Sequence, residues 1–158
     1  MTATTALSAA RTTRISGRIR SFLVAQPVWR AGVLAALAGA LVTEGYAQVM
    51  RALGVPMKAA SPGADSAEPI PNFGFASGVL FWAVVGVVLA VALARWAKRP
   101  ARTFTVTTVV LTTVSLAPPF MAPHTAVSTQ IVLAVAHLVA AAVIVPAIAV
   151  RLAGRPTR

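Results

Sequence analysis

Residues 126–150, AVSTQIVLAVAHLVAAAVIVPAIAV, decide the fold class of this chain. The stretch contains no Asp, Glu, Lys or Arg, and a helix needs about 20 mostly apolar residues to cross about 30 Å of hydrocarbon. Three further stretches meet the same criterion, at about 31–53, 75–94 and 103–121. The sequence therefore predicts an all-α, polytopic membrane protein built as a four-transmembrane-helix bundle.

The composition supports lipid as the main solvent. Hydrophobic residues make up 58% of the chain, charged residues only 11%, and the mean hydropathy is +0.81. Soluble domains carry about 25% charged residues, which they need to cover a surface in water. Cysteine is absent, which excludes disulfides, thiolate metal sites and thiol catalysis.

The basic residues predict the orientation. All Lys and Arg residues except Arg51 and Lys58 fall on one side of a four-span arrangement. They are Arg11, Arg14, Arg18, Arg20, Arg30, Arg95, Lys98, Arg99, Arg102, Arg151, Arg155 and Arg158. Positive charge stays cytoplasmic, so we expect a multi-pass protein of the plasma (inner) membrane with the N and C termini cytoplasmic. The net charge of +11 then indicates contact with anionic lipid headgroups at these basic clusters, and no nucleic-acid partner.

The segments outside the spans predict little regular structure. Residues 1–28 form either a disordered basic tail or an interfacial helix around Ile19 and Phe22, and residues 153–158 form a short basic tail after the transmembrane domain, 29–152. The connection 54–74 is rich in proline, so we expect it to be irregular, without helix or sheet. The start of the chain also resembles a signal peptide, although the helical pattern continues past the candidate cleavage site.

Two ionisable side chains lie well inside predicted spans, Glu44 in the first and His137 in the fourth. At 1.5 Å of rise per residue the two come within about 10 Å of one depth, so we expect an intramembrane polar pair. Glu44 could instead bond to Gln48 or to threonine hydroxyls, or extend towards Arg51 two turns further along. In a third interpretation, Glu44 and His137 line a proton or cation path.

Other residues could support this pair. The first span has small residues at every fourth position before Glu44, and the second span has a similar ridge, so both predict close helix packing. The third span is rich in hydroxyls and ends in two prolines, which leave carbonyls without helical partners and predict a kink. The supporting polar residues are Gln48, Thr112, Ser115 and Gln130, and the kink residues are Pro118 and Pro119.

Neither catalytic nor cofactor motifs accompany these residues. The sequence has no nucleophile triad, paired carboxylates, phosphate-binding glycine loop or zinc spacing, so we expect no metal, no cofactor and no enzymatic activity. The favoured function is that of a non-enzymatic accessory or interaction protein, as a homo-oligomer or with a membrane protein partner. The alternatives are a small proton-coupled transporter that uses Glu44 and His137, and a membrane-embedded enzyme that acts on lipid.

Three sequence stretches resemble a group of small four-span integral membrane proteins from actinobacteria, described only as a domain of unknown function. They are Trp-Ala-Val-Val-Gly at 82–86, Arg-Pro-Ala-Arg at 99–102 and Ala-His-Leu-Val-Ala-Ala-Ala-Val-Ile-Val-Pro at 136–146. The resemblance covers roughly residues 28–152 and implies an integral membrane protein, with no assigned activity or site residues. The chain is also similar to small multidrug exporters in its four spans and first-span glutamate. It departs from them in its strong charge bias and in its longer tail and outer loop.

Overall fold

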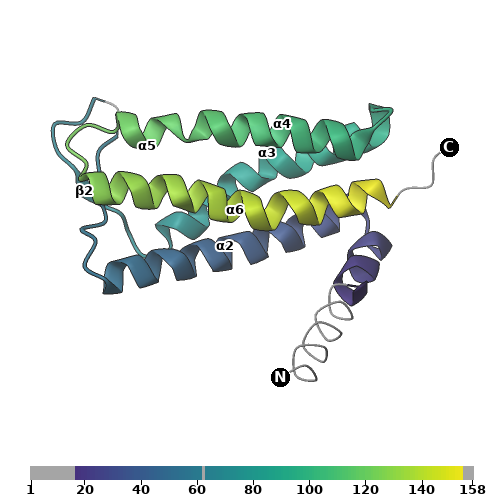
Figure 1. Cartoon of the computed structure of the whole chain (residues 1–158), viewed down its shortest axis with the longest axis horizontal. Coiled ribbons are helices and arrows are strands. Elements are labelled where there is room, and N and C mark those ends of the chain that lie inside the picture. The colour runs from purple at the N-terminus through teal and green to yellow at the C-terminus, as the bar shows by residue number, and fades with distance from the viewer. Residues whose placement is uncertain (1–16, 62, 155–158) are drawn as a thin grey trace, which may run out of the picture.

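The computed structural model describes residues 17–61 and 63–154, which form four long helical rods side by side along one axis (Figure 1). The rods are α2 (Val28–Ala52), α3 (Gly74–Trp96), α4 (Pro100–Ser115) continued by α5 (Ala117–Met121), and α6 (Val127–Ala153). All four are long and apolar enough to cross a membrane. The predicted all-α, four-span fold is confirmed, with each boundary shifted by less than one helical turn.

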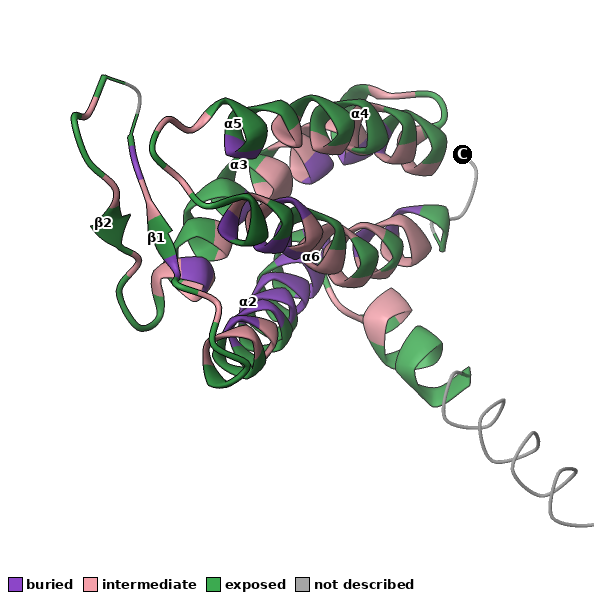
Figure 2. Ribbon diagram, turned by 60° about the vertical axis from the view of Figure 1, so that its left-hand side comes forward, coloured by how far each residue is buried: buried purple, intermediate pink, exposed green. Residues whose placement is uncertain are grey.

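Different chain segments lie at the two ends of the bundle, which we name the terminal end and the hairpin end. The terminal end holds the start of α2, the turn 97–99 and the end of α6. The hairpin end holds the connections 53–73 and 122–126. Large apolar side chains cover the outside of the bundle, and Figure 2 shows the buried residues of α2 on the face turned towards its neighbours. This distribution matches a protein surrounded by lipid, because water would make such an exterior unstable.

Helix α2 packs against both α3 and α6, and α4 packs against α6. Small residues make these approaches close: a Cβ added to Gly32 would lie 2.7 Å from Val87 of α3, and one added to Gly39 would lie 2.7 Å from Ile144 of α6. The small-residue face of the first span therefore does look into the bundle, as its spacing predicts.

A short β-hairpin closes the hairpin end. Strand β1 (Lys58–Ala59) pairs antiparallel with β2 (Glu68–Pro69), so the prediction of a connection without sheet is wrong. Pro69 is accommodated because it ends the second strand and needs to donate no further ladder hydrogen bond. The hairpin packs onto the bundle: Met57 is buried with Phe75 and Val132, and the Ala60 amide donates to Thr125 Oγ1 at 3.1 Å.

The third rod is interrupted at Leu116, one residue before α5 begins. Pro118 and Pro119 lie in the first turn of α5, where a missing amide hydrogen is tolerated, and Ser115 Oγ donates to the Thr112 carbonyl at 2.7 Å. Helix resumes through Met121, so the predicted kink is a short break at Leu116, and irregular backbone begins only after α5.

The N-terminal segment is helical over residues 17–25 and lies at an angle to the bundle beside the end of α6 (Figure 1). Val24 fills the space next to Gly154, and Arg151 Nε donates to the Gln26 carbonyl. A disordered tail is therefore wrong for this part of the chain. The rest of the predicted tail, residues 1–16, and residues 155–158 lie outside the described residues.

Candidate functional site

Glu44 lies in the second half of α2, with only 7% of its surface exposed. Two donors come from its own helix. Gln48, one turn further on, donates from Nε2 to Oε1 at 2.7 Å, and Arg51, two turns further on, approaches the same oxygen from a terminal guanidinium nitrogen at 3.4 Å. These spacings place all three side chains along one face of α2.

Two further donors come from the backbone of α3. The amide of Phe73 donates to Glu44 Oε1 at 3.1 Å, and the amide of Ala76 donates to Oε2 at 3.1 Å. Phe73 is the N-cap of α3, and no side chain of its own segment caps the helix. The first amides of a helix have no partner within it and carry a partial positive charge. Glu44 therefore caps the start of α3 from a neighbouring helix.

Arg51 extends this network to the segment that leads into α3. Its other terminal nitrogen donates to the carbonyls of Ile70 and Pro71, each at 3.0 Å. The guanidinium thus bridges the Glu44 carboxylate and the residues just before the capped turn. Phe73 has a left-handed backbone with φ 65, which this double attachment holds in place. We name Glu44, Gln48, Arg51 and the α3 start the Glu44 network.

His137 is not part of the Glu44 network. Its ring is exposed on α6, and its Nδ1–H donates to the Leu133 carbonyl one turn earlier at 2.7 Å. The expected pairing of Glu44 with His137 is therefore corrected. Glu44 faces the start of α3, whereas His137 is exposed on α6 and bonds to its own helix.

Of the remaining predicted polar residues, one belongs to the Glu44 network and three do not. Gln48 does bind Glu44, as one of the alternatives predicted. Gln130 instead donates to the Ala122 carbonyl at 3.2 Å, just after α5. Thr112 accepts from Ser115 through its carbonyl. These last three residues bond within the broken third rod and at its exit, and no hydrogen bond joins them to the Glu44 network within the described residues.

Sequence reasoning missed the backbone amides of α3 as partners of Glu44. The structure identifies Phe73 as the N-cap, whereas the sequence offers Asn72, a favoured capping residue, one position earlier, so the need for an acceptor from another helix has no signal in the sequence. The sequence predicts Arg51 only as a partner for Glu44, and its hydrogen bonds to the Ile70 and Pro71 carbonyls have no signal in the sequence.

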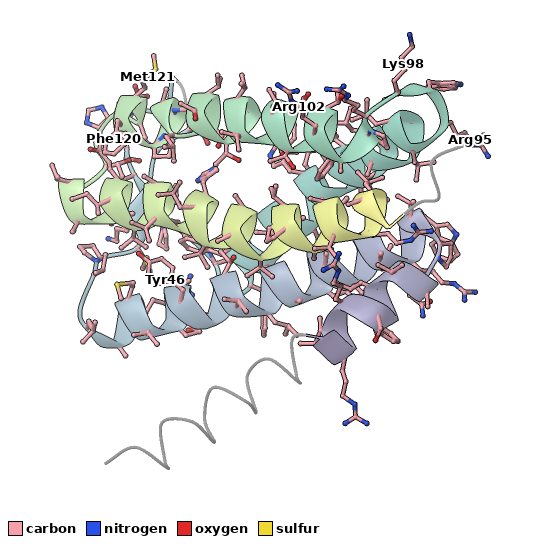
Figure 3. The ribbon with its side chains drawn as sticks, turned by 45° about the vertical axis from the view of Figure 1, so that its right-hand side comes forward. Tyr46, Arg95, Lys98, Arg102, Phe120 and Met121 are labelled. Atoms are coloured by element: carbon pink, nitrogen blue, oxygen red, sulfur yellow. The ribbon has the colours of Figure 1, made fainter. Side chains whose placement is uncertain are left out.

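The Glu44 network fixes a carboxylate in one position through hydrogen bonds. The carboxylate accepts four hydrogen bonds, two of them from backbone groups that cannot rotate away. Within the described residues, no group of three or more His, Cys, Asp or Glu side chains could hold a metal ion. Tyr46, labelled in Figure 3, packs into the apolar cluster at the hairpin end.

Comparison with known proteins gives one result. A family model described as "Family of unknown function (DUF6069)" matches residues 24–154, which covers all four spans and the Glu44 network. No curated protein and no solved structure matches the chain.

Proposed function

The chain belongs to the family of unknown function DUF6069, and we propose for it the role of a non-enzymatic accessory or interaction protein of the membrane. One observation carries this proposal: both oxygens of its only intramembrane carboxylate are bound by backbone amides at the start of the next helix, from the N-cap Phe73 and from Ala76. A proton carrier must exchange its partners, or gain and lose water, in every cycle. The Glu44 network supports a packing role for the carboxylate instead.

The transporter and the lipid-acting enzyme are less well supported. Both would have to use Glu44, His137 and Tyr46. Glu44 is engaged with α3, and His137 is bonded to its own helix. Tyr46 packs among apolar residues. We therefore propose that none of the three is catalytic.

The transport alternative is tested by proton flux in proteoliposomes that carry a pH-sensitive dye. We expect the wild-type protein to give no flux above empty vesicles, and Glu44→Gln to change the stability of the protein without changing the flux. Glu68→Gln is the matched control, because Glu68 is exposed on the hairpin. Flux that is present in the wild type and in Glu68→Gln but lost in Glu44→Gln would overturn the proposal.

For the interaction itself, we propose the outer face of α3 as the contact with a second copy or another membrane protein. A Cβ added to Gly78 or Gly86 would meet no atom within 4 Å, so the bundle does not use these glycines for its own packing. Trp82 lies between them and is 69% exposed. Crosslinking in native membranes tests this face: Gly78→Leu should reduce crosslinked complexes, and Val84→Leu on another exposed face should not.

We further propose the plasma membrane as the location, with both termini cytoplasmic, and an actinobacterial source. The orientation is supported by the basic residues, which gather at the terminal end. Figure 3 shows Arg95 and Lys98 there, opposite Phe120 and Met121. The source is supported by the resemblance described above.

A further inference from the structure

A cavity of about 270 Å³ opens at the terminal end of the bundle, far from the Glu44 network. The start of α2, the end of α3 and the end of α6 all contribute to its wall. The lining includes Val28, Trp29, Val91, Ala94, Arg95 and Arg151. The cavity therefore lies between three spans at the level where the membrane-spanning segments end.

Two arginines line this cavity without an acidic partner. Arg151 uses Nε to bind the Gln26 carbonyl, and its terminal nitrogens make no hydrogen bond within the described residues. The chain has only three Asp and Glu residues, and all of them, Glu44, Asp65 and Glu68, belong to the half of the molecule at the hairpin end. No side-chain carboxylate of this chain can neutralise Arg95 and Arg151, so the cavity favours an anion from outside.

The rest of the wall is apolar. Val28, Val91 and Ala94 face the cavity from α2 and α3. Trp29 adds an indole at the edge, with the Arg30 guanidinium 5.1 Å from its ring centroid. Indole rings favour the headgroup level of a bilayer, and basic pockets between spans at this level suit lipid headgroups. A ligand with a phosphate at one end and hydrocarbon at the other would match both halves of the wall.

We propose that this cavity binds the phosphate of an anionic phospholipid, whose acyl chains run along the apolar surface of α2 and α3. Guanidinium groups bind phosphate oxygens through paired N–H donors, which lysine cannot do in the same geometry. The proposal does not depend on the Glu44 network or on the orientation of the protein in the membrane.

Native mass spectrometry of the full chain in neutral detergent tests the proposal, with phosphatidylglycerol, phosphatidylcholine and inorganic phosphate as probes. We expect one tightly bound phosphatidylglycerol, with at least tenfold preference over phosphatidylcholine, and no displacement by millimolar phosphate. Arg95→Gln should weaken this binding about tenfold. Lys98→Gln and Arg102→Gln are the matched controls, since they remove the same charge outside the cavity, and they should leave binding unchanged.

Three outcomes would overturn the proposal. Equal losses in Arg95→Gln and the two controls would show diffuse attraction to anionic lipid. Displacement by inorganic phosphate would assign the cavity to a soluble anion. Equal binding of phosphatidylglycerol and phosphatidylcholine would show that the cavity does not select an anionic lipid. The two arginines would then only interact with the partial negative charge at the C-termini of their own helices. Val91→Phe provides a second variant that keeps every charge: it should fill the cavity, reduce phosphatidylglycerol binding and leave the Arg151 contact with Gln26 in place.

Discussion

At the scale of single residues, Glu44 shows how an apolar helix can hold a carboxylate. An unpaired carboxylate in hydrocarbon costs several kcal/mol. Here the cost is offset by charge-assisted hydrogen bonds from Gln48, from Arg51 and from two amides at the positive end of α3. The carboxylate therefore accepts from amides that have no partner within α3, and these amides in turn stabilise the buried charge.

Double-mutant cycles distinguish the observed partner of Glu44 from the one predicted by depth. We expect Glu44→Ala and Arg51→Ala to be coupled by about 0.5–3 kcal/mol in the free energy of unfolding, because their side chains are in contact. Glu44→Ala and His137→Ala should be additive within about 0.5 kcal/mol, because they share no contact. Unfolding by SDS in mixed micelles measures both. Coupling to His137 as strong as coupling to Arg51 would contradict the described contacts.

At the scale of elements, the four spans were predictable because length and hydrophobicity are local properties of the sequence. The break near Pro118 was predictable for the same reason, since a missing amide hydrogen acts on the carbonyl one turn earlier. The hairpin was missed because proline density says nothing about tertiary support. Met57 and Ala60 anchor this connection to the bundle, and that contact permits two short paired strands.

The pairing of Glu44 could not be derived in the same way. Rise per residue gives the depth of a side chain, but the rotation of each helix about its axis depends on how the helices pack. Small residues on α2 predicted which face turns inwards, and this was confirmed. They did not say which neighbour Glu44 would meet. Its backbone partners at Phe73 and Ala76 also carry no side-chain signature in the sequence.

Two glycines provide an element-scale prediction about helix packing. Gly32→Ala should lower the free energy of unfolding by about 1–3 kcal/mol, because the new methyl group would lie 2.7 Å from the stiff side chain of Val87. Gly78→Ala should leave the free energy of unfolding unchanged or raise it by up to about 1 kcal/mol. Alanine favours helix more than glycine does, and the new Cβ would meet no atom within 4 Å. Unfolding in micelles compares the two. Equal losses would contradict the described packing of α2 on α3.

At the scale of the whole molecule, the two ends differ in charge. Arg95, Lys98 and Arg151 lie at the terminal end, and all three acidic residues belong to the half at the hairpin end. This asymmetry supports one fixed orientation, and it is the charge bias by which the chain departs from the small multidrug exporters. It also separates the two features described above, since the Glu44 network and the arginine-lined cavity lie in opposite halves of the bundle.

Single cysteines test the orientation, because the chain contains none of its own. Ser61→Cys on the hairpin and Ala153→Cys at the end of α6 are both exposed, and they lie at opposite ends. In intact cells, a membrane-impermeant maleimide should label only Ser61→Cys. After the membrane is opened, it should label both. Labelling of Ala153→Cys in intact cells would invert the proposed topology.

The bond between Glu44 and the start of α3 also has a consequence for biosynthesis. The carboxylate and its amide partners are 29 and 32 residues apart, with the hairpin between them. While the ribosome is still making that hairpin, the carboxylate has only its partners on its own helix, Gln48 and Arg51, and lacks the two amides, so the first span is less well suited to lipid. We therefore expect the first two spans to leave the translocon together as one unit, and the first span alone to insert inefficiently.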